Sequence, residues 1–258
     1  MLNINTNYAA AFATNAAKRT TASIETAMER LSTGSRINYS RDDAAGLAIA
    51  TRLNSEVQSL SAASRNAADA QSMLDTTDGA LAETHSVLIR MRELAVQAAN
   101  GTLDDTDRAA LDAEFQQLES EIDRINSNTS FAGISLFDGS AKTFHIGTGN
   151  AVSDKVSHTF TSLASHNLDL DSAGPNNVVG GTTTDDVVRD LTSAANAQTM
   201  LGEIDAAIAT VSTERGKLGA LSNRLSSTVA NLDQIGVNLS SSKGRIQDAD
   251  FAAETSNL

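Results

Sequence analysis

Residues 204–246, IDAAIATVSTERGKLGALSNRLSSTVANLDQIGVNLSSSKGRI, decide the fold because an aliphatic side chain recurs at every seventh position. The repeat consists of Ile204, Val211, Leu218, Leu225, Leu232, Leu239 and Ile246. A sustained seven-residue repeat is typical of a helix that packs lengthwise on other helices. A neighbouring stripe that contains Arg215, Ser222 and Lys243 is half polar, so we expect a small bundle rather than a strict two-stranded coiled coil. We predict this helix from about Asp185 to Ile246.

The first half of the chain carries the same repeat. It consists of Leu53, Leu60, Ala67, Leu74, Leu81, Leu88 and Ala95, and predicts a helix from about Ala44 to Asn100 that ends at Asn100-Gly101. The leucines of this repeat, together with the aliphatic residues from 204 to 239, form the predicted buried seam of the rod. Another helix is expected from about Asp104 to Ser127, because aspartates in its first turn complement the helix dipole.

Weaker patterns occupy the N-terminus and the middle of the chain. A short amphipathic helix is predicted up to Gly34, and Asp42 and Asp43 are candidates to cap the next helix. Glycine-rich residues 128–184 predict short hairpin strands around Ile134 and Phe144, and an exposed loop from 175 to 186. Thr182, Thr183 and Thr184 make this loop rich in hydroxyl groups.

The predicted fold class is mainly α, as an elongated bundle of long antiparallel helices. It has a small β-hairpin region between the second and third rod helices, and an N-terminal helical arm. Because both ends of the chain are helical and the irregular part lies between them, the ends have to pack together. This arrangement suits the subunit of a polymer.

Composition and charge exclude several classes of function. The 258 residues include no cysteine, which excludes disulfides, thiolate metal sites and cysteine nucleophiles. The net charge of −13 disfavours nucleic acid as a partner. No apolar run approaches the roughly 20 residues that span a bilayer, so no membrane insertion is expected.

Motifs for catalysis and for cofactor or metal binding are also missing from the sequence. The four histidines, His85, His145, His158 and His166, have no paired metal-ligand spacing. Gly147-Thr148-Gly149 lacks the third glycine of a dinucleotide site, and residues 104–107 lack the glycine and distal glutamate of a calcium loop. No nucleophile lies beside a base in a recognisable motif. We therefore predict no catalytic, cofactor-binding or metal residues, and a protein that is not an enzyme.

Several blocks, taken in order, resemble one family. They are MLNINTN at 1–7, LSTGSRIN at 31–38, DDAAGLAIA at 42–50, RELAVQAANGT at 92–102, IDRI at 122–125, FAGISLFDG at 131–139 and SKGRIQDADFAAET at 242–255. In sequence and spacing they are similar to the bacterial flagellins. The resemblance covers roughly 1–148 and 190–258.

The resemblance implies a domain organisation. Residues 1–43 would form an inner-tube arm and connector, and 44–145 the N-terminal helices and hairpin of a rod domain. Residues 146–184 would be a short variable middle segment, 185–246 the C-terminal rod helix, and 247–258 the start of a C-terminal arm. Flagellins usually continue into a last helix that pairs with the N-terminal arm. Without that helix, the arm over residues 1–40 is expected to lack its partner within this chain.

The resemblance also implies function, location and partners. The chain would be a self-assembling subunit of the extracellular flagellar filament, exported unfolded through the type III channel. Its partners would be copies of itself, hook-associated and cap proteins, a cytoplasmic export chaperone and, for the monomer, Toll-like receptor 5. Two alternatives stay open: a hook–filament junction protein, and a helical secreted adhesin or chaperone.

Two sets of residues correspond to interaction sites of flagellins. The receptor-recognition and inter-subunit set comprises Ile89, Arg90, Met91, Arg92, Glu93, Leu94 and Glu114. In it we expect Arg90 to supply a planar donor fork and Leu94 an apolar anchor, or the set to make subunit contacts only. The second set comprises Phe131, Ile134, Leu136, Phe137, Phe144 and Ile146. It corresponds to a switch between filament supercoil states, or to an inert hairpin over the apolar end of the rod.

Overall fold

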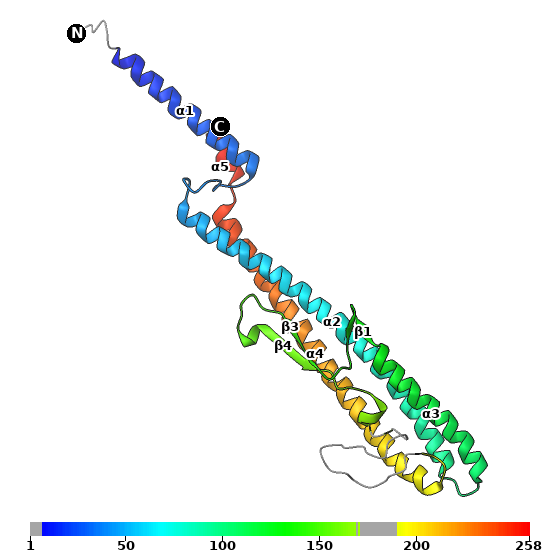
Figure 1. Ribbon diagram of the computed structural model, residues 1–258. Helices are drawn as coiled ribbons and strands as arrows, with labels where there is room; N and C mark the ends of the chain where they lie inside the picture. Colours follow the sequence, from blue (N-terminus) through cyan, green and yellow to red (C-terminus); the bar gives the residue numbers. More distant parts are fainter. Residues whose placement is uncertain (1–6, 169, 171–189) are drawn as a thin grey trace. The chain divides into compact units, whose positions relative to one another are not determined.

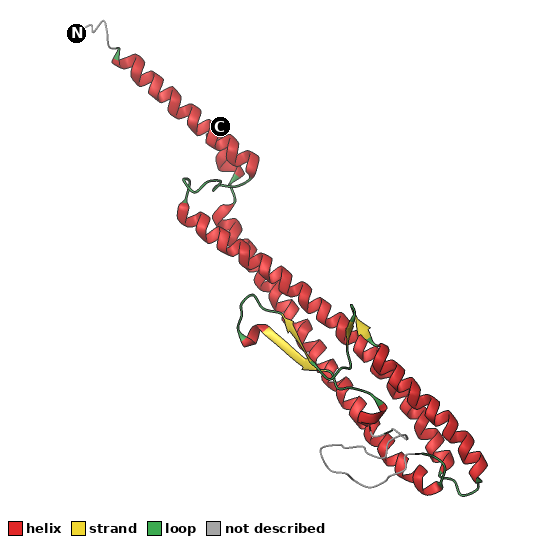
Figure 2. Cartoon of the chain, in the orientation of Figure 1, coloured by secondary structure: helices red, strands yellow, loops and turns green. Residues whose placement is uncertain are grey.

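The computed structural model describes residues 7–168, 170 and 190–258, and most of them are helical (Figure 2). The helices are α1 (Tyr8–Thr33), α2 (Ala44–Ala98), α3 (Asp105–Asn128), α4 (Ala194–Gln247) and α5 (Phe251–Asn257) (Figure 1). The strands are β1 (Ser130–Phe131), β2 (Ile134–Ser135), β3 (Ala141–His145) and β4 (Lys155–Thr159), with short 3-10 turns at Val152–Asp154 and Ser165–Leu168. The mainly α fold class with small hairpins is confirmed.

The described chain forms two compact units. The first contains residues up to 64 together with 230–258, and the second contains residues 65–229. The division into an inner-tube arm and a rod domain stays a prediction. Residues 1–6, the loop expected at 175–186 and the three threonines at 182–184 lie outside the described residues. Among the described helices, none combines the length and the hydropathy that a membrane span requires.

Local capping sets the helix ends of the first unit. Asn7 Oδ1 accepts from the Ala10 amide at the start of α1, and Gly34 ends α1 in the left-handed conformation at φ 69°. The prediction for Asp43 is confirmed, since its Oδ1 accepts from Gly46 N at 2.8 Å at the start of α2. The prediction for Asp42 is wrong, because its carboxylate accepts from the amides at positions 38 and 39 in the preceding turn.

The first unit joins the two ends of the chain mainly through polar contacts. The Arg36 amide donates to Gln247 O at 2.7 Å, and the Ala249 amide donates to Gly34 O at 3.0 Å. An ion pair of 2.9 Å links Arg30 on α1 to the buried Glu254 on α5. The apolar cluster of this unit is small and consists of Leu60, Ala63 and Leu232, with Leu239 partly buried against it.

The second unit has a continuous apolar core between α2, α3 and α4, with β3 and β4 lying along α4 (Figure 1). Phe115 and Ile122 of α3 are fully buried in it. The α2–α3 turn contains a buried arginine: Arg108 donates to Ala98 O and Asn100 O, both at 3.0 Å. These carbonyls have no partner inside α2 because they lie at its end, so Arg108 serves as a side-chain cap.

The predicted seam is buried along both long helices, except that Leu239 is only partly buried. The buried members are Leu53, Leu60, Leu74, Leu81, Leu88, Ile204, Val211, Leu218, Leu225 and Leu232. The second buried stripe of α4 lies four residues before the seam positions, at Met200, Ala207, Glu214 and Leu221. The stripe that contains Arg215 and Ser222 is half-buried, which accounts for its mixed composition.

The prediction that the last long helix begins near Asp185 is wrong. Residues 190–193 form bends, and α4 begins at Ala194. Asp190 Oδ1 accepts from Thr192 N, and Ser193 Oγ accepts from Asn196 N at 3.1 Å. Short polar side chains that bind nearby amides favour a helix start over a helix interior, so the helix begins after Ser193.

The hairpin prediction is confirmed in the middle of the chain. β1 and β2 pair antiparallel across a turn in which Ala132 and Gly133 have φ of 50° and 81°. β3 pairs antiparallel with β4, with Phe144 opposite Val156. The side-chain amide Nδ2 of Asn66 on α2 donates to His145 O at 3.0 Å, which holds this hairpin to the helix.

Candidate functional site

The most elaborate charged cluster on the second unit centres on Arg90 of α2. Its Nε and Nη2 donate to Glu114 Oε1 of α3 at 3.0 and 2.7 Å, and its Nη1 donates to Glu93 Oε2 at 3.0 Å. The hydrogen bond to Glu114, then that to Glu93, raises the pKa of Arg90. All three side chains are half exposed, so the guanidinium is held in one orientation while staying accessible. The cluster therefore presents a fixed arrangement of charges.

Arg92 points to another helix. Its Nε donates to Asp205 Oδ1 of α4 at 2.7 Å. This hydrogen bond raises the pKa of Arg92 and lowers the pKa of Asp205. The sequence analysis missed Asp205, because its partner lies 113 residues away and no local pattern signals the pairing.

The expectation that Leu94 offers an apolar anchor is wrong. Leu94 is 1% exposed and Met91 is 0% exposed, because they continue the stripe of Leu88 that faces the core. The exposed apolar side chains nearby are Ile89 and Val96, at 43% and 50%.

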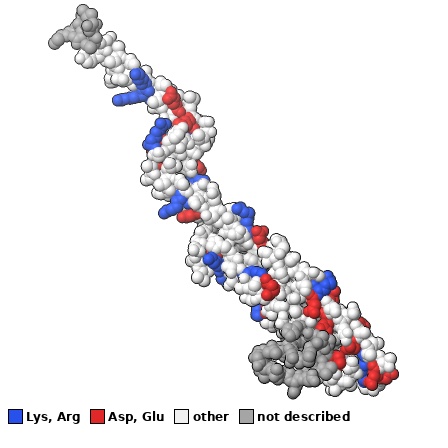
Figure 3. Space-filling view, in the orientation of Figure 1, with Lys and Arg blue, Asp and Glu red and all other residues white. Residues whose placement is uncertain are grey.

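Helical spacing places Ile89, Glu93 and Val96 on one side of α2. Ile89, Arg90, Glu93, Val96 and Glu114 form what we call the α2–α3 face. Acidic side chains also gather near the α2–α3 turn (Figure 3). The face thus combines apolar side chains with an ordered set of charges.

The hairpin set divides into buried and exposed members. Leu136, Phe137 and Ile146 are buried in the core, and Phe131 and Phe144 are half-buried against it. Ile134 is 48% exposed and so is the member available to another molecule. Val152, which the sequence analysis did not single out, is 90% exposed beside the β3–β4 turn.

Helix α1 of the first unit is almost uncovered. Among its described residues only Ala27 is buried, whereas Tyr8, Phe12 and Met28 are 74%, 78% and 52% exposed. Tyr8 and Phe12 lie one helical turn apart and so form one apolar patch. The patch has no cover within the described chain.

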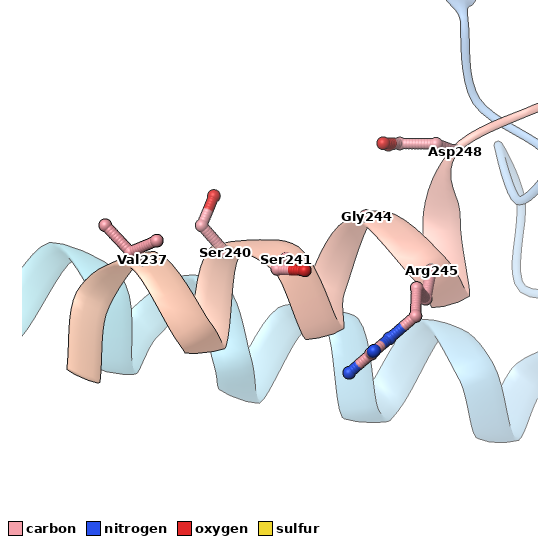
Figure 4. Close-up of a pocket in the computed structure, with 6 residues that line it drawn as sticks. All are labelled: Val237, Ser240, Ser241, Gly244, Arg245 and Asp248. Carbon is pink, nitrogen blue, oxygen red and sulfur yellow. The ribbon is translucent and has the colours of Figure 1, made fainter. Parts of the chain in front are cut away.

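A shallow groove lies along the C-terminal part of α4 in the first unit. It is lined by Val237, Ser240, Ser241, Gly244, Arg245 and Asp248. Val237, Ser240 and Asp248 project on the same side of the helix, while Arg245 points elsewhere (Figure 4). Its open, small-residue lining favours protein contact over small-molecule capture.

The described residues include no group of three or more histidine, cysteine, aspartate or glutamate side chains that could hold a metal ion. His158 is the histidine with an unusual environment. Its Nε2 is buried without a hydrogen-bond partner among the described atoms, and its ring stands edge-on to Phe160 at 4.9 Å. Burial lowers the pKa of His158.

Comparison with known proteins places this arrangement in a family. Residues 4–142 match the bacterial flagellin N-terminal helical region, and residues 201–258 match the bacterial flagellin C-terminal helical region. The chain belongs to the bacterial flagellin family. Flagellins are structural proteins, and this flagellin is a structural subunit of the bacterial flagellar filament.

Individual relatives agree with the family. Over 88% of its length this flagellin is 41% identical to a flagellin from Halalkalibacterium halodurans, of which it covers 79%. It is 37% identical to Bacillus subtilis flagellin and 33% identical to Vibrio cholerae flagellin A, over its whole length and 90% and 92% of theirs. The Bacillus cereus flagellin structure is 33% identical, with a TM-score of 0.50 over 65% of this chain and 88% of that one.

The likeness to a candidate hook-associated protein is of a different kind. That structure, from Vibrio parahaemolyticus, has a TM-score of 0.65 over 80% of this chain and all of its own. Its sequence identity is 17%, so the likeness lies in the fold alone. The relatives that share sequence with this chain carry the name flagellin.

Proposed function

We propose that this flagellin builds the filament, without catalysis, by burying surfaces that the single chain leaves exposed. The observation that carries the proposal is the uncovered helix α1, with Tyr8 and Phe12 exposed on one side. An isolated helix is marginal in water and gains most of its stability from packing an apolar face. We infer that α1 gains its cover during assembly, from the partner helix that flagellins usually carry and from neighbouring copies.

The test removes the apolar patch without touching the core. The double variant Tyr8→Ser, Phe12→Ser is compared with the parent chain in polymerising salt, by sedimentation and electron microscopy. We expect the parent to form tubular filaments and the variant to stay monomeric with unchanged circular dichroism. Val152→Ser is the control, since it removes an equally exposed apolar side chain elsewhere. Filaments from the double variant at the parent's critical concentration contradict the proposal.

A second proposal concerns the α2–α3 face. We infer that the monomer presents this face to Toll-like receptor 5, and that the same face is covered between subunits in the filament. Support comes from the ordered Arg90–Glu114 pair, because a guanidinium already held in one orientation loses little conformational entropy on binding. Ile89 supplies the apolar contact that Leu94 is too buried to make.

Receptor-bearing cells stimulated with purified monomer test this assignment. Arg90→Ala removes a central arginine and is expected to weaken stimulation by about tenfold or more. Arg124→Ala is the matched control, because Arg124 forms a similar exposed pair with Glu121 on α3 at 2.6 Å. Ile89→Ser separates the two parts of the face. Full potency of both Arg90→Ala and Ile89→Ser rules the face out.

The hairpin set supports a third proposal, that Ile134 contacts an adjacent subunit and takes part in the switch between supercoil states. The buried members Leu136 and Phe137 fix the hairpin to the core, so a contact at Ile134 is transmitted to a rigid base. We expect Ile134→Ser to change filament waveform at intact polymerisation. Val152→Ser serves again as the control, and an unchanged waveform in Ile134→Ser contradicts the switch.

Location and further partners follow from the flagellin family as proposals. We propose type III export aided by a cytoplasmic chaperone, an extracellular position in the filament, and contacts with cap and hook-associated proteins. Fractionation of motile cells tests the location. Sheared filaments are expected to contain the chain, and its retention inside the cells contradicts export.

A further inference from the structure

The α2–α3 turn contains the one Asn–Gly step of the sequence, Asn100-Gly101. Both residues are exposed. A side chain at position 101 would meet no atom within 4 Å, so the turn is open on the side of the Gly101 α-carbon. An asparagine followed by glycine is the pair in which the next backbone nitrogen most easily reaches the side-chain carbonyl, because glycine has no side chain to obstruct it.

We propose that Asn100 is a site of spontaneous deamidation and that the folded turn directs the product to isoaspartate. The Gly101 nitrogen attacks Asn100 Cγ and closes a five-membered imide ring. The Cγ–Nδ2 bond breaks, and ammonia leaves with the proton of the Gly101 amide. Water then opens the ring at one of its two carbonyls, and the resulting acid loses its proton.

The position of water attack decides the product. Opening at the Cγ carbonyl gives aspartate, whereas opening at the main-chain carbonyl gives isoaspartate, with the main chain rerouted through Cβ and Cγ. Before reaction, the Asn100 main-chain oxygen accepts from Arg108 Nη2 at 3.0 Å, and Oδ1 accepts from the Thr102 amide at 3.2 Å. A charged donor polarises a carbonyl more than a neutral amide does, so water is drawn to the main-chain carbonyl.

The negative charge of the product also favours isoaspartate. Isoaspartate places its free carboxylate where Arg108 already donates, and Arg108 is itself held by Ala98 O at 3.0 Å. Aspartate would instead place its carboxylate on the side-chain branch, where Oδ1 accepts from the neutral Thr102 amide. The folded turn therefore stabilises isoaspartate over aspartate.

The two Asp–Gly steps provide internal comparisons. Asp78-Gly79 lies inside α2, where the backbone conformation is fixed, and Asp78 accepts from Arg215 at 2.8 Å. Asp138 accepts from Lys142 and from Ser140, which lowers its pKa, and an ionised carboxylate is a poor target for attack. We expect neither step to isomerise on the timescale of Asn100.

The experiment incubates the folded full chain at mildly alkaline pH and follows residue 100 by peptide mass spectrometry. Fragmentation by electron transfer distinguishes aspartate from isoaspartate, and the same chain in denaturant gives the reference ratio. We expect residue 100 to deamidate while 78 and 138 stay intact, with a several-fold higher isoaspartate-to-aspartate ratio in the folded chain than in denaturant. Asn100→Gln, which would need a larger ring, is expected to lose the signal.

Arg108→Gln tests the directing role, with circular dichroism to confirm that the helices remain. Its isoaspartate-to-aspartate ratio is expected to fall to that of the denatured chain. Arg108→Lys keeps the charge and is the second variant to use if Arg108→Gln does not fold. Its isoaspartate-to-aspartate ratio is expected to lie between those of the folded and the denatured parent. An intact Asn100 in the folded chain when the denatured chain has reacted overturns the site. Equal ratios in the folded and denatured parent overturn the directing role.

Discussion

The two units of the subunit are stabilised in different ways. The second unit buries a continuous cluster that includes Phe115, Phe160 and most of the leucine seam. The first unit buries a cluster of three residues, and its chain ends are connected by main-chain hydrogen bonds and the Arg30–Glu254 ion pair. Apolar burial is the largest favourable contribution to folding, so we expect the second unit to be the more stable of the two. The proposed assembly surface on α1 therefore belongs to the unit with the smaller apolar cluster.

The largest expected effect comes from the core of the second unit. Phe115→Ala removes a side chain that is 0% exposed and is expected to lower the free energy of unfolding by about 4 kcal/mol. Urea denaturation followed by circular dichroism measures it. Phe12→Ala in α1 deletes the same atoms at a position 78% exposed and is expected to change the monomer by less than about 0.5 kcal/mol. Similar losses of unfolding free energy in both variants would contradict this difference between the two units.

A smaller and more local effect is expected in the first unit. Leu60→Ala truncates the central member of its apolar cluster, at a cost of about 2 kcal/mol because the thin packing relaxes around the cavity. Hydrogen exchange should show loss of protection over residues 44–64 and unchanged protection over 65–98. Ile49→Ala, on the same helix but 42% exposed, is the control. Equal loss of protection in both segments would mean that the units unfold together.

The ion pair between the chain ends is expected to contribute less. Glu254→Gln keeps the shape of the side chain and removes its charge opposite Arg30, at a cost of about 1 kcal/mol. Faster exchange of the α5 amides, with no change in the second unit, is the expected result. Glu93→Gln, in an exposed pair on α2, provides the comparison. Unchanged exchange in α5 would show that main-chain contacts alone hold the ends together.

The smallest effect is a pH dependence of the second unit. Burial lowers the pKa of His158 from 6.5, opposed in part by the charge of Glu214 and aided by that of Lys217. The unfolded chain therefore binds the proton more readily, so stability is complete above pH 6.5 and decreases as the pH falls through the folded-state pKa. Thermal melts between about pH 5 and pH 8 should show this slope in the parent and a smaller slope in His158→Gln. His145→Gln, at an exposed position, should retain it.

The seven-residue repeat predicted most of the fold because side-chain burial in a long helix follows its period. It identified the seam from Leu53 to Leu232, and residue chemistry identified the cap at Asp43. The second stripe of α4 was not predicted, and one of its members, Glu214, is charged although it is buried. The predicted start of α4 was wrong because helical periodicity does not detect the polar turn over residues 190–193.

The candidate site was predicted only in part. Family resemblance led to Arg90 and Glu114, which the structure brings together. It did not indicate that Leu94 faces the core, because adjacent positions of a helix lie on different sides and the neighbouring Glu93 is exposed. The pair of Arg92 with Asp205 depends on how α2 and α4 align, which only tertiary packing determines.

The contact between the chain ends also has a consequence for the order of folding. Arg30 and Glu254 are separated by 224 residues, whereas Arg108 and Asn100, which are hydrogen-bonded in the α2–α3 turn, are separated by 8. Long loops close slowly and at an entropic cost, so the local helical hairpin forms first and the junction of the ends forms last. The Arg30 end of α1 is thus held in place only after residue 254 has been synthesised. An ordered junction therefore requires that the helix carrying Glu254 has been made and has folded.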